Sequence, residues 1–219
     1  TDDDEIEDYD EIFTYSTNPT DSDTDDDGLT DYGEIFTHGT DPLLPDTDED
    51  GLNDGLEITI GINPLAIDSD SDGLNDTWEY TRISQGYNYS PGNNDTDGDG
   101  VLDGDEDLDT DGLTNLEEIN TYGTNPMDED SDGDTLWDGD EVKPWEIDKD
   151  GINNQYNYPS NPNNLDSDGD GLSDYEEVTP SNDTYDSRTD PEDSDTDGDG
   201  LSDYDEIRWY WNITASAPL

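Results

Sequence analysis

Apolar residues are sparse along this chain, and they recur at fixed places between acidic runs. One Leu or Val follows each of eight such runs, and a short amphipathic segment comes next, as in residues 31–37. The segments end in signals such as Gly-Thr-Asp-Pro at 39–42 and Gly-Ile-Asn-Pro at 61–64. Because Gly ends helices and Pro prevents their continuation, the pattern predicts one to two helical turns per unit. Irregular loops should join these turns, without a conventional hydrophobic core.

The acidic runs share one twelve-residue register. In the run that begins at Asp23, carboxylates stand at positions 1, 3, 5, 9 and 12, with Gly at position 6 and Leu at position 7. Position 6 is Gly in seven of the eight runs and Thr135 in the other, while position 9 is Asp in seven and Asn115 in the other. The further runs begin at Asp46, Asp68, Asp95, Asp107, Asp130, Asp166 and Asp195.

This register matches the calcium loop of an EF-hand, D-x-[DN]-x-[DN]-G-x5-E. Ca²⁺ takes about six to eight oxygen ligands, which positions 1, 3, 5 and 9, the carbonyl of position 7 and a bidentate Glu at position 12 supply. The Leu or Val at position 7 is expected to turn inward. Gly at position 6 makes a sharp turn that a Cβ would disfavour. We therefore predict about eight or more bound Ca²⁺ ions, and we expect calcium to bind in preference to Mg²⁺, which demands a tighter octahedral geometry.

The expected ligands follow directly from the register. They are Asp23, Asp25, Asp27, Leu29, Asp31, Glu34, Asp46, Asp48, Asp50, Leu52, Asp54, Glu57, Asp68, Asp70, Asp72, Leu74, Asp76, Glu79, Asp95, Asp97, Asp99, Val101, Asp103, Glu106, Asp107, Asp109, Asp111, Leu113, Asn115, Glu118, Asp130, Asp132, Asp134, Leu136, Asp138, Glu141, Asp166, Asp168, Asp170, Leu172, Asp174, Glu177, Asp195, Asp197, Asp199, Leu201, Asp203 and Glu206.

Two degenerate units add weaker candidate ligands. They are Asp2, Asp4, Asp8 and Glu11 in a truncated repeat, and Glu146, Asp148, Asp150 and Ile152 in an incomplete loop. The incomplete loop has Asn154 and Asn157 where Asp and Glu should stand. Position 1 of the truncated repeat would precede Thr1, so we expect a processed product or a fragment of a longer array.

Composition narrows the class of protein. The chain has 219 residues, with 66 Asp plus Glu, five Lys plus Arg, a net charge of −61, 26% hydrophobic residues and no Cys. It has no apolar run near the ~18 residues of a membrane span, no basic patch for nucleic acid and no disulfide. Such a composition is typical of disorder. However, 49 of the acids are Asp, and 39 of the 66 occupy ligand positions, so we interpret the metal as the substitute for a core.

The pattern resembles the thrombospondin type 3 repeat in the Cys-free form of bacterial and archaeal surface proteins. The residues that carry the resemblance are Asn-Pro pairs such as Asn63-Pro64, the loop from Asp195 to Leu201 and the Asp-Tyr-Asp-Glu segment at 203–206. The resemblance covers about the whole chain. It implies an extracellular calcium-loaded array, often a stalk, linker or adhesin segment. Without the Cys of animal thrombospondins, calcium must replace the inter-repeat disulfides. Dockerin modules carry such loops only as a pair, which argues against a dockerin.

We expect one elongated repeat array over residues 1–219. Its loops start near 23, 46, 68, 95, 107, 130, 146, 166 and 195, with a truncated repeat at 1–19 and a tail at 207–219. Insertions at 80–94, 142–165 and 178–194 interrupt it, and Tyr-Asn-Tyr recurs at 87–89 and 156–158. These tyrosines either form a lateral contact surface or pack locally. The aromatic, β-prone tail either caps the last loop or supports head-to-tail assembly into filaments.

The sequence favours an extracellular calcium-binding structural protein. It would be a calcium-rigidified stalk or fibre subunit on or outside a prokaryotic cell, assembling head to tail. The alternative is an adhesin arm that binds a glycan or a protein through its insertions. No enzyme is expected, because the lone His38 lies in a terminator turn, Cys is absent and nearly all carboxylate pairs belong to loops. Charge mimicry of nucleic acid does not explain the twelve-residue registers.

Sequons of the form N-x-[ST] mark candidate N-glycosylation sites, if the protein is secreted. They are Asn75, Asn88, Asn94, Asn182 and Asn212. Asn88 lies on an insertion and is the best candidate, whereas Asn75 occupies position 8 of a loop and should point outward. Random occurrence in a chain rich in Asn, Ser and Thr explains the sequons equally well.

Overall fold

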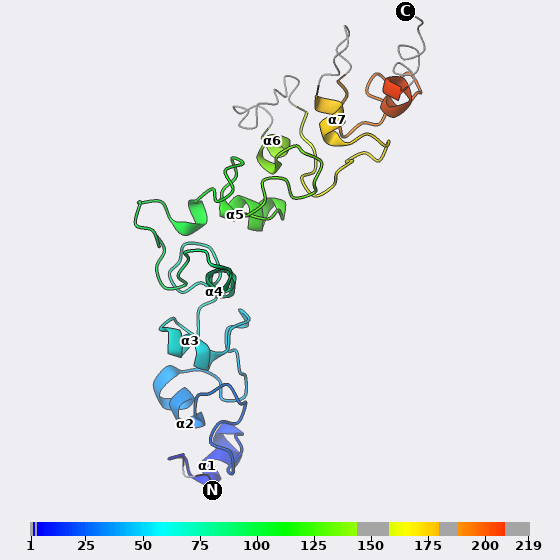
Figure 1. The fold of residues 1–219 in the computed structure, drawn as a ribbon. Helices are drawn as coiled ribbons and strands as arrows, with labels where there is room; N and C mark the ends of the chain where they lie inside the picture. The colour runs from blue at the N-terminus through cyan, green and yellow to red at the C-terminus, as the bar shows by residue number, and fades with distance from the viewer. Residues whose placement is uncertain (1, 3, 144–157, 180–187, 209–219) are drawn as a thin grey trace, which may run out of the picture. The chain divides into compact units, whose positions relative to one another are not determined.

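The computed structural model describes residues 2, 4–143, 158–179 and 188–208. The chain forms two compact units, Thr1–Asp105 and Glu106–Leu219. Within the described residues the regular structure consists of short helices, and no strand is present (Figure 1). The following predicted features lie outside the described residues: the incomplete loop at Glu146, Asp148, Asp150 and Ile152, the sequons at Asn182 and Asn212, and the tail from residue 209. The single array over residues 1–219 stays a prediction.

Each loop is followed by a short helical segment. In the first unit these are α1 (Asp8–Asp10), η1 (Glu11–Tyr15), α2 (Asp31–Gly33), η2 (Glu34–His38), α3 (Asp54–Ile60), α4 (Asp76–Gln85) and η3 (Asp103–Asp105). The second unit has α5 (Asn115–Glu117), η4 (Glu118–Tyr122), α6 (Asp138–Val142), α7 (Asp174–Val178) and a helix over 203–208. An irregular repeat array with short helices is therefore confirmed. With 10 residues, α4 is longer than predicted, because it runs on into the first insertion.

The helical segments begin at position 9 of the loop. In four loops the position-8 side chain caps the first turn, whereas Asn53 and Trp137 make no side-chain cap bond. The Thr30 hydroxyl accepts a hydrogen bond from the Gly33 backbone N–H at 3.1 Å. Thr114 and Glu117 form a reciprocal capping box at the start of α5. Such caps satisfy backbone donors that have no partner within the helix. An Asp in the first turn is favoured by the helix dipole as well.

The predicted terminators end the helices. Gly39, Gly61 and Gly123 have left-handed backbone, with φ of +82°, +88° and +74°. Ser16 takes the same place after η1 with φ of +67°. After η2, the Gly39 N–H donates to the carbonyl oxygen of Glu34 at 2.7 Å, which closes a wide π turn. These amphipathic segments thus stop one residue before the turn that leads to the next loop, whereas Lys143 and Thr179, which follow α6 and α7, do not have left-handed backbone.

The small apolar core consists mainly of position-7 side chains. Those that are buried are Leu52, Leu74, Leu113, Leu136 and Leu172. The inward orientation predicted for position 7 is wrong for Val101 and Leu201, which are 41% and 53% exposed. Each of these two belongs to the last loop described in its unit, so no following repeat of that unit covers it.

Successive repeats contact each other directly. The Gly55 N–H on α3 donates to Asp27 Oδ2 at 3.0 Å, and the Gly139 N–H on α6 donates to Asp111 Oδ2 at 2.8 Å. A Cβ at Gly55 would lie 2.4 Å from the carbonyl oxygen of Asp27, so only Gly fits this close approach. The same bond recurs from Tyr175 to Asp134 at 2.6 Å and from Tyr204 to Asp170 at 2.5 Å.

The two later insertions leave this docking unchanged. The Ser160 hydroxyl, late in the insertion at 142–165, donates to Glu141 Oε1 at 2.8 Å. The Thr189 hydroxyl, late in the insertion at 178–194, donates to Glu177 Oε1 at 2.9 Å. In both cases the chain returns to the position-12 Glu that preceded the insertion. The insertions are therefore additions to the repeat and not breaks in it.

In the first insertion, the aromatic residues pack locally. Tyr89 is buried and meets Trp78 edge-on, with ring centroids 5.2 Å apart. The Arg82 guanidinium lies over the Trp78 ring, with its Cζ 4.8 Å from the ring centroid. Local packing thus accounts for Tyr89, while Tyr87 remains 40% exposed.

Candidate metal centres

The carboxylates at positions 1, 3 and 5 converge in the loops from Asp23, Asp46 and Asp68. Their ligand atoms lie within 4.8 Å of one another in the groups Asp23, Asp25, Asp27; Asp46, Asp48, Asp50; and Asp68, Asp70, Asp72. The loop backbone holds them in place: the Gly28 N–H donates to Asp23 Oδ2 at 3.1 Å and the Leu29 N–H to Asp27 Oδ1 at 2.7 Å. Without a counter-ion, three carboxylates at this separation repel one another.

Two left-handed residues give the loop its shape. The seven glycines at position 6 have φ between +97° and +106°, and Thr135 takes the same place with φ of +85°. Position 4 is left-handed too, with φ from +61° at Glu49 to +82° at Gly133. The sequence signal for this second turn is the Gly at position 4 of four loops. Glu5, at position 6 of the truncated repeat, has φ of +80° and so follows the same register.

A second group of carboxylates spans the junction between repeats. Asp27 and Glu34 share it with Asp54, which comes from the following repeat, and their ligand atoms lie within 4.8 Å of one another. An equivalent junction lies one repeat further on. Burial and neighbouring carboxylates, among them Asp76 of the next repeat, raise the pKa of Glu57. The corresponding pairs further along are Glu79 with Asp103, Glu118 with Asp138, and Glu141 with Asp174. Position 9 therefore lies against the preceding repeat.

In six of the eight loops and in the truncated repeat, the Glu at position 12 is fully enclosed by protein. These residues are Glu11, Glu34, Glu57, Glu79, Glu118, Glu141 and Glu177. Glu106 and Glu206, which end the loops from Asp95 and Asp195, are only half-buried. Among the described residues, neither carboxylate oxygen of Glu57 or Glu79 has a hydrogen-bond partner. Burial, followed by the charges of Asp70 and Asp72, raises the pKa of Glu79 to about 9. An ionised carboxylate in such a place needs a cation or a proton.

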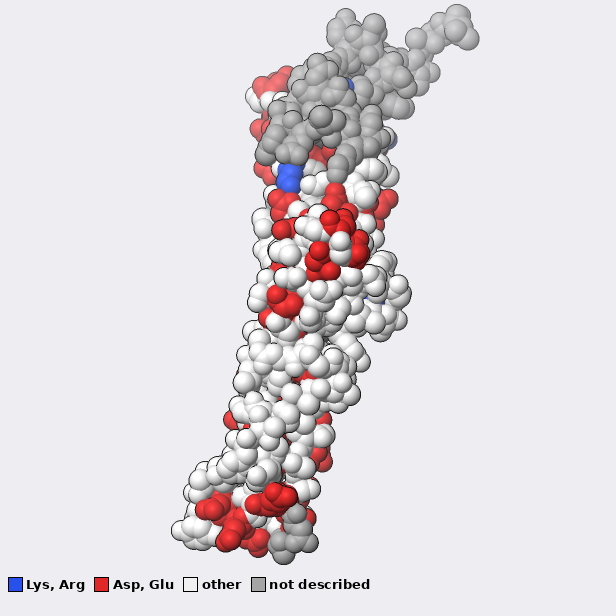
Figure 2. Space-filling view, turned by 90° about the vertical axis from the view of Figure 1, so that its left-hand side faces the viewer, with Lys and Arg blue, Asp and Glu red and all other residues white. Residues whose placement is uncertain are grey.

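This donor set fits Ca²⁺. All the converging side-chain atoms are oxygens, and buried carboxylate oxygens that have no hydrogen-bond partner in the described part of the chain, such as Asp25 Oδ2 and Glu57 Oε1, fit a bound cation. Positions 1, 3, 5 and 12 of one repeat and position 9 of the next would hold it. On the face drawn in Figure 2 the acidic side chains form separate patches with other surface between them. The position-9 and position-12 carboxylates that are fully enclosed do not contribute to that surface.

A hydroxyl at position 2 fixes the position-9 Asp, and the EF-hand register does not reveal this contact. In the loop from Asp46, Asp54 accepts the Thr47 N–H at 2.9 Å and the Thr47 hydroxyl at 2.6 Å. The sequence signal for this contact is a Ser or Thr at position 2, which seven of the eight loops have. The eighth has Leu108, and it is the loop in which position 9 is Asn115.

A second hydroxyl binds the position-12 Glu. It belongs to the Ser or Thr that stands directly before an Asn-Pro or Asp-Pro pair in the next turn. The bonds run from Thr40 to Glu34 at 3.2 Å, from Thr124 to Glu118 at 3.3 Å, from Ser160 to Glu141 and from Thr189 to Glu177. The sequence pattern predicts only a helix end at this turn and not the hydroxyl contact.

The other predicted residues are placed as follows. Asp2, Asp4 and Glu11 of the truncated repeat form one group of ligand atoms within 4.8 Å of one another. Asp95, Asp97 and Asp99 belong to the first unit, whereas the Glu106 predicted to complete their loop begins the second. The sequon residues Asn75, Asn88 and Asn94 are exposed, and Asn75 Oδ1 accepts the Trp78 N–H at 2.6 Å as a helix cap.

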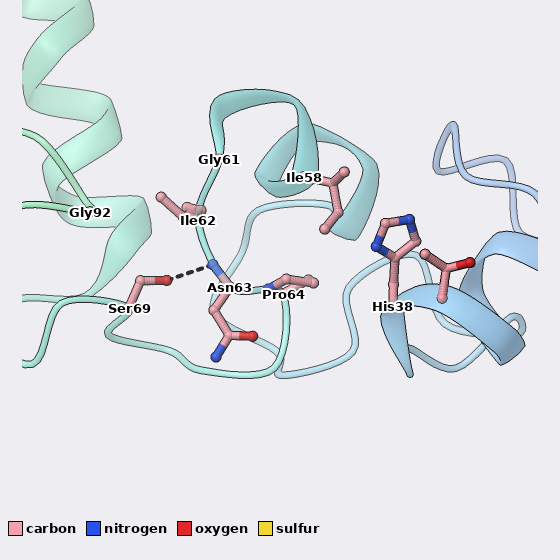
Figure 3. A pocket seen from close by; sticks show the side chains of 9 residues that line it. His38, Ile58, Gly61, Ile62, Asn63, Pro64, Ser69 and Gly92 are labelled. Atoms are coloured by element: carbon pink, nitrogen blue, oxygen red, sulfur yellow. Dashed lines mark hydrogen bonds between the residues drawn. The ribbon is translucent and has the colours of Figure 1, made fainter.

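His38 lies in a crevice of about 460 Å³ between the end of η2 and the turn after α3 (Figure 3). Ile58, Ile62 and Pro64 line it together with small polar residues. His38 is the one titratable side chain in the lining, so the crevice offers no acid–base pair.

Register, turns and buried carboxylates together define an array of calcium-loop repeats. The model of the family described as "Bacterial TSP3 repeat" matches residues 23–45, 46–66, 107–129, 166–179 and 195–208. The chain thus contains five bacterial TSP3 repeats, which form a structural calcium-binding module and not an enzyme family. The loops from 68, 95 and 130 lie outside these matches but share the two left-handed turns. The comparisons with curated proteins and with solved structures gave no match.

The raised pKa values predict that calcium-free protein is more stable in mild acid. Burial first, then nearby Asp charges, raise the pKa from 4.5 to about 8 for Glu57 and about 9 for Glu79. The folded state then binds more protons than the unfolded state between about pH 4.5 and 9, so stability falls as pH rises through this window. Circular dichroism of chelator-treated protein should show more helix and a higher Tm at pH 5 than at pH 8. The opposite order would mean that these carboxylates are not buried in the calcium-free state.

The loop with Thr135 should respond to a single substitution. A β-branched residue with φ of +85° is strained, whereas Gly adopts this backbone freely. Thr135→Gly should therefore stabilise the calcium-loaded protein by about 1 kcal/mol and tighten calcium binding at this loop. Calorimetric titration and thermal unfolding measure both effects, with Thr121→Gly as the control in a helical segment. An unchanged affinity and Tm for Thr135→Gly would contradict the expectation.

Proposed function

We propose that the protein is an extracellular calcium-binding structural protein, a calcium-rigidified stalk or fibre subunit on or outside a prokaryotic cell. The observation that carries this proposal is the row of enclosed position-12 glutamates. Glu57 and Glu79, in two successive repeats, lie inside carboxylate clusters, and none of their four carboxylate oxygens has a hydrogen-bond partner among the residues that the structure describes. A chain that buries such groups repeatedly depends on a cation for its fold.

Rigidity would follow from the group that spans the junction. A cation shared by Asp27, Glu34 and Asp54 would tie one repeat to the next, in addition to the hydrogen bond between Gly55 and Asp27. With calcium ~30-fold above Kd, each site would contribute about 2 kcal/mol to folding. Because many junctions are alike, a long element is stiffened without a large core. This supports a stalk or rod more than a compact binding domain.

An extracellular location suits the chemistry. Extracellular calcium modules bind with Kd on the order of 10⁻⁴–10⁻³ M, and the expected eight or more ions need a calcium-rich medium. Among the described residues, no helix has the length and apolar character to cross a membrane. The exposed Asn88 is the best-placed candidate for an N-glycan in such a location.

Head-to-tail assembly is supported by exposed apolar side chains. Tyr9 and Phe13 on the first helical segment are 68% and 70% exposed and pair with ring centroids 4.8 Å apart. Phe36 of the next repeat is 55% exposed. Exposed aromatic residues are enriched where proteins associate. The alternative, an adhesin arm, would use the same kind of surface for a glycan or another protein.

Removal of calcium should unfold the repeats. EGTA leaves the clustered carboxylates without a counter-ion, so helical circular dichroism should fall and chymotrypsin should cleave at the Tyr and Trp residues within minutes. Restoring calcium should reverse both effects, and the same concentration of Mg²⁺ should not. Identical spectra and digestion patterns with and without EGTA would refute a calcium-dependent fold.

Light scattering in calcium distinguishes the fibre subunit from the adhesin arm. A fibre subunit should form particles that grow with protein concentration, and deletion of residues 209–219 should abolish them. Electron microscopy of the same samples should show filaments. A calcium-loaded chain that stays monomeric at all concentrations would exclude the fibre subunit and leave the adhesin arm.

A further inference from the structure

The position-9 Asp belongs to two repeats at once. Asp54 is fully buried, and both its oxygens are bound within its own loop by the backbone and the hydroxyl of Thr47, at 2.9 and 2.6 Å. Its ligand atom nevertheless lies within 4.8 Å of those of Asp27 and Glu34 in the preceding repeat. The loop from Asp46 thus holds a carboxylate in place for the cluster of the loop from Asp23.

The Thr47 hydroxyl accepts one hydrogen bond and donates another, which fixes the direction of its proton. Its oxygen accepts the Asp41 backbone N–H at 3.0 Å, so its one proton is free to point to Asp54. The next repeat has the same arrangement: Ser69 accepts the Asn63 N–H at 2.9 Å, drawn as a dashed line in Figure 3, and donates to Asp76 at 2.6 Å. The turn before each loop therefore orients the hydroxyl that orients the Asp.

The relay recurs along both units. The further pairs of position-2 hydroxyl and position-9 carboxylate are Thr24 with Asp31 at 2.7 Å, Ser131 with Asp138 at 2.6 Å, Ser167 with Asp174 at 2.7 Å and Thr196 with Asp203 at 2.8 Å. Leu108 cannot donate such a bond, and its partner position carries the uncharged Asn115. Ser or Thr at position 2 and Asp at position 9 thus occur together in the sequence. The loop from Asp95 differs in its bonds: the Thr96 N–H donates to Asp103 at 2.9 Å, and the Thr96 hydroxyl donates to the Asn93 carbonyl oxygen at 3.1 Å.

We infer that the position-2 Ser or Thr is a positioning residue for the calcium site of the preceding repeat, so that each loop, when folded, strengthens binding one repeat upstream. This inference rests on the proposed calcium-binding function. The coupling has a direction, because Thr47 orients Asp54 toward the loop from Asp23. The loop from Asp68 receives nothing from Thr47. Local damage to one loop, in contrast, would weaken both of its neighbours.

Hydrogen exchange of the full-length protein, followed by mass spectrometry across a calcium titration, tests this inference repeat by repeat. In Thr47→Val the calcium concentration that half-protects residues 23–37 should rise about tenfold, while that for residues 68–85 should change less than twofold. Thr47→Ser should restore the wild-type value, because it keeps the hydroxyl. Thr59→Val is the matched control: Thr59 is exposed on α3 of the same repeat and bonds only to the Gly55 carbonyl.

The outcomes separate the two levels of the argument. Equal shifts in residues 23–37 and 68–85, no shift in residues 23–37, or failure of Thr47→Ser to restore binding would overturn the inference alone. If wild-type protein shows no calcium-dependent protection in any repeat, the proposed function fails with it. Should Thr47→Val not fold in saturating calcium, Ser69→Ala repeats the test one junction along. It should shift residues 46–60 and leave residues 23–37 unchanged.

Discussion

Carboxylates enclosed by protein and close to one another are strongly unfavourable unless a cation or a proton neutralises them. Most of the repeats enclose such a carboxylate, the Glu at position 12. Glu141 shows it most clearly: burial raises its pKa to about 10, although Ser160 donates a hydrogen bond that lowers it. Because the chain keeps such groups in most of its repeats, the proposed calcium-binding function makes the cation a part of the fold and not an accessory to it. The small cluster of position-7 leucines is secondary to this electrostatic core.

The constraint also orders the repeats along the chain. A loop offers three carboxylates of its own, encloses its Glu and meets the Asp of the following repeat. Backbone donors such as the Gly55 N–H reach across the same junction. Neighbouring repeats are therefore joined by the groups that would bind metal, and stability depends on nearest-neighbour contacts. Insertions between repeats are tolerated because Ser160 and Thr189 restore the contact with the enclosed Glu.

Much of this could be predicted from the sequence, because a twelve-residue register with Gly at position 6 leaves few structural choices. The helix ends at Gly39 and Gly61 could be predicted as well, since left-handed backbone favours Gly. The contacts between repeats could not be predicted from the sequence. The register gives Asp54 to its own loop, and only the packing of α3 on the preceding loop places it beside Asp27 and Glu34. The exposure of Val101 likewise depends on which repeat follows within the unit.

The central claim is that bound calcium replaces a hydrophobic core, and a metal count on the folded protein tests it most directly. The full chain, passed through a desalting column in millimolar calcium, is analysed for calcium by elemental mass spectrometry and for helix by circular dichroism. The account predicts eight or more Ca²⁺ ions per chain, and loss of helix in parallel with loss of metal. A chain that keeps its helices while holding one ion or none would contradict it.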